Sequence, residues 1–88
     1  MRLDQFLQKT GIVKRRALAK EICDRGNVEL NGRTAKAAHE VKPGDELVVK
    51  FREKRCRYRV SDVPTGNVRK DQREAYVELT AEEHFHSL

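Results

Sequence analysis

A cluster of cations stands at the start of a helical pattern in this 88-residue chain. Lys14, Arg15 and Arg16 are consecutive, and Lys20 follows Arg16 by four residues, so Arg16 and Lys20 share one face of a helix. Backbone N–H groups at a helix start bind phosphate, and the planar guanidinium of arginine matches phosphate oxygens. The cluster indicates either an anion-binding site or a solvated basic face, and taken alone it does not decide between them.

A tight turn follows the same helical pattern. Asn31 and Gly32 lie between strand-like residues, and both tolerate the positive φ of a two-residue hairpin turn. The sequence predicts positive φ at Gly32, where the absence of a side chain also allows another molecule to approach the backbone closely. Two further cations follow the turn, Arg33 and Lys36.

Two helices and a small sheet are predicted to position these residues. The apolar spacing gives a first helix near Leu3 that ends at Thr10-Gly11, and a second helix over residues 14–25 with its apolar face at Ala17, Leu18 and Ile22. Strands are expected at 28–30, 46–51, 56–60 and 75–79, with turns at 31–32 and 43–45. The segments between them are expected to be irregular at 34–42, a charged hairpin tip at 52–55 and a mobile loop at 61–74. The acidic tail is expected to fray. The predicted fold class is α+β, with two short helices packed on a small, mostly antiparallel sheet.

The charges are segregated along the chain. The net charge is +5 in total, but residues 1–25 carry +4 (seven basic, three acidic), residues 51–70 carry +5 (seven basic, two acidic) and residues 71–88 carry −4 (one basic, five acidic). A basic protein with segregated charge favours a polyanionic partner, which can be RNA, DNA or an anionic membrane surface.

The remaining residues offer little for catalysis or metal binding. No apolar run is long enough to span a bilayer, and the first residues lack the apolar stretch of a secretory signal. Cys23 and Cys56 stand alone and are expected to be reduced packing residues of a cytoplasmic chain. His84 and His86 have no third ligand, so we expect no metal and no cofactor. No serine or cysteine occurs with a suitable histidine and acid at a glycine-rich turn, and the carboxylates are scattered, so we expect no enzymatic activity.

Four segments in order resemble a known RNA-binding domain. They read R-L-D-x-F-L at 2–7, V-K-R-R-x-L-A-K at 13–20, G-x-V-x-L-N-G at 26–32 and V-K-P-G-D-E-L at 41–47. Together they resemble the domain named after the fourth protein of the small ribosomal subunit, in which two helices and a β-hairpin form an alpha-L motif that grips structured RNA. The resemblance implies one RNA-binding domain over 1–88, with the motif core at 1–50 and a β extension and acidic tail at 51–88.

Among the branches of this family, the chain is most similar to the free-standing RqcP group of bacterial ribosome-associated quality control. That resemblance implies a cytoplasmic, ribosome-associated monomer that binds the dissociated large ribosomal subunit with peptidyl-tRNA. It would contact both ribosomal RNA and the tRNA. It would assist C-terminal alanine tailing of stalled nascent chains beside the tail-elongating factor RqcH.

The same resemblance assigns roles to residues. Leu3, Phe6, Leu18, Val28 and Leu30 match core positions, whereas Thr10-Gly11 replaces a basic residue common in relatives. The implied RNA-binding residues are Arg2, Lys14, Arg15, Arg16, Lys20, Asn31, Gly32, Arg33 and Lys36. In the fold that the resemblance implies, the turn at Asn31-Gly32 lies near the start of the second helix and forms one anion-binding surface for RNA with the arginines there.

Several alternatives remain open from the sequence. Arg55, Arg57 and Arg59 share one strand face, which can protect an edge strand from aggregation or supply an auxiliary RNA contact. Other functions in the same family are large-subunit recycling of the heat-shock-protein-fifteen type, rRNA maturation, and the accessory domain of a pseudouridine synthase. A DNA-binding helix-turn-helix is disfavoured because a strand, not a recognition helix, follows the second helix.

Overall fold

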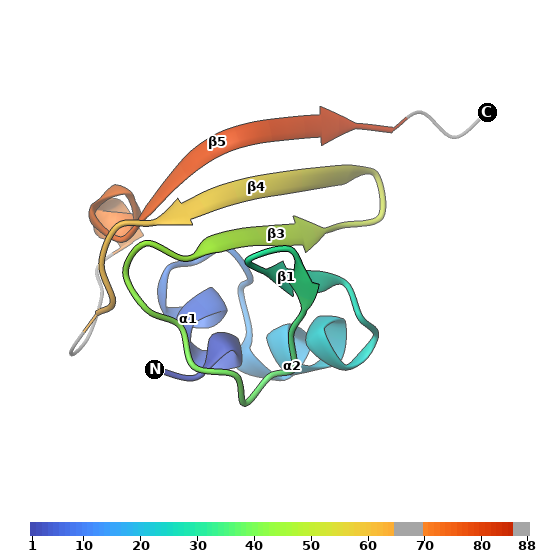
Figure 1. Cartoon of the computed structure of the whole chain (residues 1–88), viewed down its shortest axis with the longest axis horizontal. Helices are drawn as coiled ribbons and strands as arrows, with labels where there is room; N and C mark the ends of the chain where they lie inside the picture. The colour runs from blue at the N-terminus through green and yellow to red at the C-terminus, as the bar shows by residue number, and fades with distance from the viewer. Residues whose placement is uncertain (65–69, 86–88) are drawn as a thin grey trace.

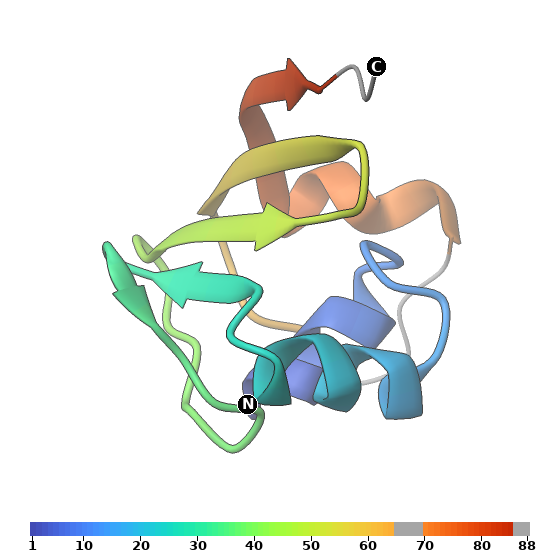
Figure 2. The ribbon, with the colours of Figure 1, turned by 90° about the vertical axis from the view of Figure 1, so that its right-hand side faces the viewer.

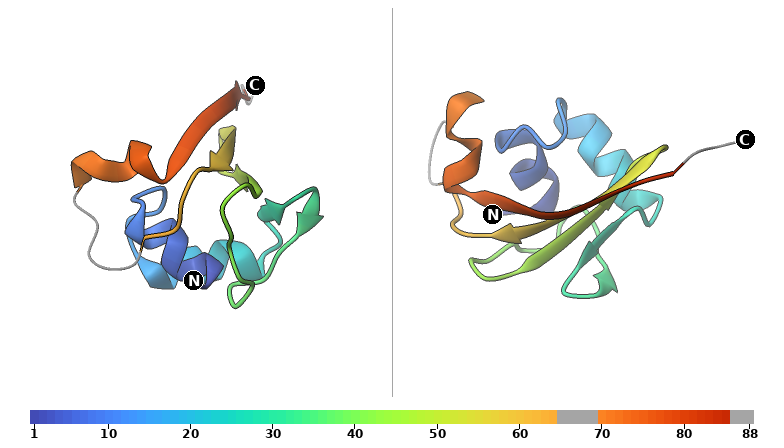
Figure 3. Two further views of the ribbon diagram at one scale, coloured as in Figure 1. Left: turned by 60° about the vertical axis from the view of Figure 1, so that its left-hand side comes forward. Right: turned by 90° about the horizontal axis from the view of Figure 1, so that it is seen from above.

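Two helices lie on one face of a five-stranded antiparallel sheet (Figures 1 and 3). The computed structural model describes residues 1–64 and 70–85. The sheet has the order β2-β1-β3-β4-β5. The elements are α1 (Leu3–Lys9), α2 (Arg16–Asp24), β1 (Val28–Leu30), β2 (Arg33–Thr34), β3 (Glu46–Lys50), β4 (Lys54–Val60), the 3-10 helix η1 (Lys70–Ala75) and β5 (Val77–His84). The predicted α+β fold class is confirmed.

Helix α1 supplies the centre of the core. Leu3, Phe6 and Leu7 recur at helical spacing and are 0% exposed. The helix ends where the Thr10 hydroxyl donates to the Phe6 carbonyl at 2.8 Å and Gly11 takes φ +75°, a backbone conformation that glycine adopts without strain. The predicted stop at Thr10-Gly11 is confirmed.

Helix α2 differs from the prediction in its start and in its buried face. It begins at Arg16, with Arg15 as its N-cap, rather than at Lys14. The buried residues are Ala19 and Cys23, whereas Ala17 is exposed and Leu18 is 46% exposed. The small side chains at Ala19 and Cys23 allow α2 to approach α1 closely, which turns the larger Leu18 outward. The assignment of Leu18 to the core is therefore wrong.

The hairpin between β1 and β2 forms as predicted. Asn31 has φ +54° and Gly32 has φ +82°, as a primed two-residue turn requires. The Asn31 amide nitrogen also donates to the Asp45 carboxylate at 3.0 Å, and its amide oxygen accepts from the Glu46 N–H at 2.9 Å. Asn31 thus joins this turn to the start of β3.

We expect Gly32→Val to lower the free energy of unfolding by about 1–3 kcal/mol because valine is strained at this φ. No atom lies within 4 Å of the position of an added Cβ, so backbone strain alone would cause the loss. Gly32→Asn is the control, since asparagine tolerates the left-handed region better. Urea titrations of both variants measure the difference, and equal stability of the valine variant and the parent would contradict it.

The last part of the sheet is more ordered than the sequence predicts. β4 starts at Lys54, so the hairpin tip is shorter than residues 52–55. β5 pairs with β4 from Val77 to His84, and the expected frayed tail is wrong over this stretch. Ala75 belongs to η1 rather than to a strand, and η1 also replaces the end of the predicted mobile loop at 61–74. Residues 65–69 of that loop lie outside the described residues.

A bulge interrupts the ladder between β4 and β5. Arg57 is opposite Ala81 and Tyr58 is opposite Leu79, so Thr80 is the additional residue on β5. The Thr80 hydroxyl donates to the Arg57 carbonyl at 3.2 Å and holds the bulge against β4.

The core lies between the helices and the inner face of the sheet. From the strands it receives Val28, Leu47, Val49, Cys56 and Val60, each at most 2% exposed. The irregular segment 34–42 contributes as well, since Ala35, Ala37 and Val41 are buried. This segment therefore packs against the helices as a structural part of the fold. Its only regular pairing is at Thr34, the last residue of β2, and at Glu40, which forms an isolated bridge with Arg2.

Candidate nucleic-acid interface

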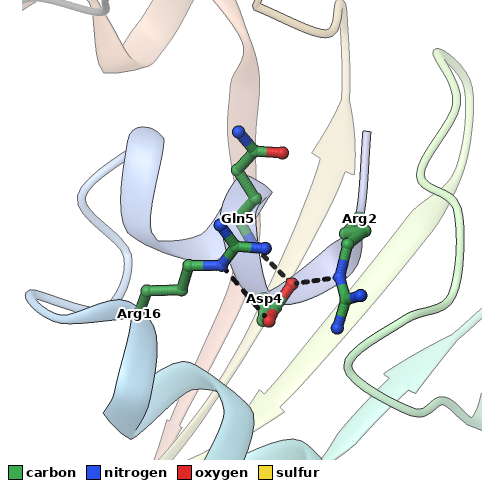
Figure 4. A network of polar contacts seen from close by, with 4 residues as sticks. All are labelled: Arg2, Asp4, Gln5 and Arg16. Atoms are coloured by element: carbon green, nitrogen blue, oxygen red, sulfur yellow. Dashed lines mark hydrogen bonds and ion pairs between the residues drawn. The ribbon is translucent and has the colours of Figure 1, made fainter.

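A buried carboxylate joins two arginines from different parts of the fold (Figure 4). Asp4 lies in the first turn of α1 and is 3% exposed. Its Oδ1 accepts from the Arg2 Nε at 3.2 Å and from the Gln5 backbone N–H at 2.8 Å, and its Oδ2 accepts from the Arg16 Nε at 3.4 Å. The structure therefore brings together Arg2, before α1, and Arg16, the first residue of α2.

The Asp4 carboxyl is held in its charged form. Burial would raise its pKa, but the hydrogen bonds from Arg2 and the Gln5 N–H and the charge of Arg16 outweigh burial and lower the pKa below the ordinary value of 3.8. At neutral pH the cluster is thus one anion between two cations, with a net charge of +1.

Both guanidiniums remain available to an external anion. The Arg2 and Arg16 side chains are 49% and 50% exposed, and each reaches Asp4 through Nε. Within residues 1–64 and 73–85, no protein group accepts a hydrogen bond from their terminal nitrogens. These nitrogens form the fork that binds phosphate oxygens in pairs.

The cations around α2 extend this surface. Lys14, Arg15 and Lys20 are exposed, and Arg16 and Lys20 lie one helical turn apart. The start of α2 has no side-chain cap and no acidic residue in its first turn, so its N–H groups and its cations all favour an anion. The predicted cluster is therefore present on one exposed surface.

Lys36 joins the surface from the irregular segment. The Asp4 N–H donates to the Ala37 carbonyl at 3.2 Å, and the Leu3 N–H donates to the His39 carbonyl at 2.8 Å. This pairing places the exposed residue Lys36 beside the start of α1. We call the surface made by Arg2, Lys14, Arg15, Arg16, Lys20 and Lys36 the basic helical surface.

The hairpin turn does not join this surface at the position expected. Figure 2 shows the turn between β1 and β2 at the far end of the sheet from the start of α2. The prediction that Asn31 and Gly32 lie beside the first residues of α2 is wrong, because β1 continues from the end of that helix and carries the turn away from its start. An RNA-binding role for Asn31, Gly32 and Arg33 stays a prediction.

Two of the three arginines on this face of β4 form ion pairs within the sheet. The Arg55 Nη2 donates to both carboxylate oxygens of Glu83 at 2.8 and 2.9 Å, and Arg57 pairs with Glu46 at 3.1 Å. β4 lies between β3 and β5, so the interpretation of these arginines as edge protection for β4 is wrong. An auxiliary RNA contact on this face stays a prediction, and it would have to compete with these ion pairs.

The described residues show no second kind of site. No group of three potential metal ligands occurs among them, and no helix among them is long and apolar enough to cross a membrane. Both cysteines are buried free thiols, and burial together with the charges of Asp4 and Asp24 raises the pKa of Cys23 to about 11. Such a thiol is protonated and a poor nucleophile. His84 contacts Glu82 at 3.2 Å, and His86 lies outside the described residues.

The ion pairs of Asp4 were not predicted from the sequence. By itself, an acidic residue in the first turn of a helix indicates only a favourable interaction with the helix dipole. The signal was its position three residues before Leu7, within the apolar stripe of α1, where a carboxylate requires partners. The sequence offers many arginines as partners, and only the packing of α1 on α2 selects Arg16.

The fold and this interface define an RNA-binding protein of the S4 domain class, whose family model matches residues 1–47. A Bacillus subtilis protein named "RQC P-site tRNA stabilizing factor" is 42% identical over 82 residues, which cover 93% of this chain and 95% of that protein. A Helicobacter pylori protein of the same name is 45% identical over 64 residues, covering 73% of this chain and 76% of that one. The chain belongs to the S4 domain family and, within it, to the RQC P-site tRNA stabilizing factors.

Two solved structures share the fold. The solution structure of the hypothetical protein HP1423 has a TM-score of 0.80 and 39% identity, and the match covers 94% of this chain and all (100%) of that chain. The trimeric Vibrio cholerae Heat Shock Protein 15 has a TM-score of 0.82 over 92% of this chain and 82% of that one. Its identity is 22%, so it supports the fold alone.

Proposed function

We propose that this chain binds the dissociated large ribosomal subunit while peptidyl-tRNA is still attached, contacting both ribosomal RNA and the tRNA. The paired arginines on Asp4 carry the proposal, because two guanidinium forks from different elements are held at one place on an exposed cationic surface. An interface of this kind suits the phosphate backbone of a shaped RNA rather than a base sequence. The name of these relatives, which refers to P-site tRNA, supports the same target.

The proposed role is recognition without catalysis. The protein would hold the tRNA on the subunit, as a monomer on cytoplasmic ribosomes, while the tail-elongating factor RqcH adds alanine to the stalled chain. Residues 1–50 would form the RNA-binding core, with residues 51–88 as its extension. No group in the interface is placed as a nucleophile or a proton donor, and the functions that remain for such a surface are binding and orientation.

Cofractionation on sucrose gradients tests this function. We expect the chain to sediment with large subunits that carry peptidyl-tRNA. We expect it to leave them once puromycin has accepted the nascent peptide and the deacylated tRNA has dissociated. Equal binding to subunits without tRNA would contradict the tRNA contact and favour a recycling or maturation factor. Absence from every ribosomal fraction would contradict ribosome binding itself.

A further inference from the structure

We infer that Asp4 is a positioning residue for RNA binding, so that a buried negative charge inside the basic helical surface strengthens the hold on a polyanion. The inference rests on the proposed function, because it explains how Arg2 and Arg16 act on RNA. It differs from simple charge attraction, under which an anion at this position weakens binding to any nucleic acid.

The contacts of Asp4 define a clamp. Each carboxylate oxygen takes one arginine, and both arginines donate through Nε, at 3.2 and 3.4 Å. The Gln5 N–H and the burial of Asp4 hold the carboxylate in place. The part of each arginine side chain between Cα and Nε is thereby held as well, and the terminal nitrogens of both guanidiniums point away from the carboxylate (Figure 4).

This arrangement lowers the entropic cost of binding. A free arginine side chain samples many rotamers, and a phosphate contact must order them. An arginine already held at Nε loses less freedom when its terminal nitrogens bind, because its orientation is set beforehand. The clamp also sets the distance between the forks, since Arg2 and Arg16 share one carboxylate. A fixed spacing matches a shaped RNA better than an unordered polyanion.

The variant Asp4→Asn separates the two models because it raises the net charge by one. Charge attraction alone predicts tighter binding of the variant to every nucleic acid. The clamp predicts that affinity for large subunits carrying peptidyl-tRNA falls about tenfold, roughly the effect of losing one charge-assisted contact. Affinity for poly(U), an unstructured polyanion, should stay equal or rise. The salt dependence of subunit binding should keep its slope, because no phosphate-binding cation is removed.

Asp24→Asn is the matched control. Asp24 is exposed at the end of α2, and its carboxylate forms no ion pair among the residues that the structure describes. This variant has the same change of charge without touching an arginine. We expect its binding to subunits and to poly(U) to equal or exceed that of the parent. A loss of subunit binding as large as that of Asp4→Asn would overturn the positioning role.

A double-mutant cycle tests whether Asp4 acts through Arg16. Lysine at position 16 keeps the charge but lacks the fork geometry, so Arg16→Lys should weaken subunit binding. Adding Asp4→Asn to Arg16→Lys should then cost much less than it costs in the parent. Independent, additive losses would overturn the inference, and so would an Asp4→Asn variant that folds like the parent by circular dichroism and binds subunits as tightly.

NMR of the free protein gives a readout that needs neither a ribosome nor a stable variant. The Nε–Hε signals of Arg2 and Arg16 should exchange slowly with water in the parent, and that of Arg15 quickly. If Asp4→Asn folds, its Arg2 and Arg16 signals should exchange quickly as well. Fast exchange of both signals in the parent would overturn the clamp even if Asp4→Asn did not fold. Slow exchange without any ribosome binding by the parent would contradict the proposed function and leave the clamp in place.

Discussion

Replacing Arg2 and Arg16 together with glutamine should weaken binding to large subunits carrying peptidyl-tRNA by about a hundredfold or more. Hydrogen bonds to charged groups contribute about 1.5–3 kcal/mol each, and this variant removes two guanidinium forks that share a carboxylate. The glutamine amides can still donate to Asp4, which limits the loss of stability from a buried, unpaired carboxylate. Sedimentation with subunits over a range of protein concentrations measures the change.

The control for this variant removes the same charge from the sheet. Arg55→Gln with Arg57→Gln also takes away two positive charges, but these arginines are already paired with Glu83 and Glu46. We expect less than about a threefold loss, because exposed ion pairs contribute little and one terminal nitrogen of each arginine is already paired with a carboxylate. Equal losses in the two double variants would show that the total charge, rather than the basic helical surface, determines binding.

Replacing Phe6 with alanine should have the largest effect on stability. Phe6 is 0% exposed and is among the largest side chains buried between α1 and the sheet. Phe→Ala changes in a core cost about 3–5 kcal/mol, while a domain of this size has only about 4–13 kcal/mol in total. Urea denaturation followed by circular dichroism should show a much lower midpoint, and a variant of weak initial stability should be partly unfolded in buffer.

Leu18→Ala tests the link between burial and stability at an exposed apolar residue. Leu18 is apolar and occupies a helical position that the sequence assigned to the core, but it is 46% exposed. We expect a loss of roughly 1 kcal/mol or less, since only part of its surface leaves water on folding. A loss comparable to that of Phe6→Ala would show that Leu18 is buried in solution.

The comparison between Phe6 and Leu18 shows how far periodicity alone can predict this core. In α1 the stripe of Leu3, Phe6 and Leu7 is unambiguous, and all three are buried. In α2, Leu18 and Ile22 form an equally good stripe, yet the fully buried residues are Ala19 and Cys23, Ile22 is only partly buried against the core, and Leu18 is exposed. Helix packing distance decided between the two sides, and a sequence pattern does not contain that distance.

The hairpin turn could be predicted from the sequence, whereas strand β5 could not, because β5 depends on contacts that the sequence pattern does not contain. Asn31 and Gly32 specify their turn through local backbone energetics, so their positive φ could be predicted. β5 has mostly polar residues, and only its pairing with β4, including the Arg55–Glu83 ion pair, makes it a strand. The cations of the interface were visible in the sequence, but the carboxylate that joins Arg2 to Arg16 depends on a contact between two helices.

The pairing of β5 with β4 also affects how the molecule meets RNA. Residues 51–70 carry +5 and residues 71–88 carry −4, so the extension sums to about +1, while residues 1–25 keep +4. Helices α1 and α2 and strand β5 lie on opposite sides of the molecule in Figures 1 and 2, along one of its two shorter extents of 23 Å. The centre of charge is therefore displaced from the centre of mass toward the helices. In the field of a polyanion this displacement produces a torque that turns the helices forward within the last 8 Å or so of approach, about one Debye length at physiological salt. Association with RNA should therefore be fast, because this torque corrects the orientation of the protein before contact is made.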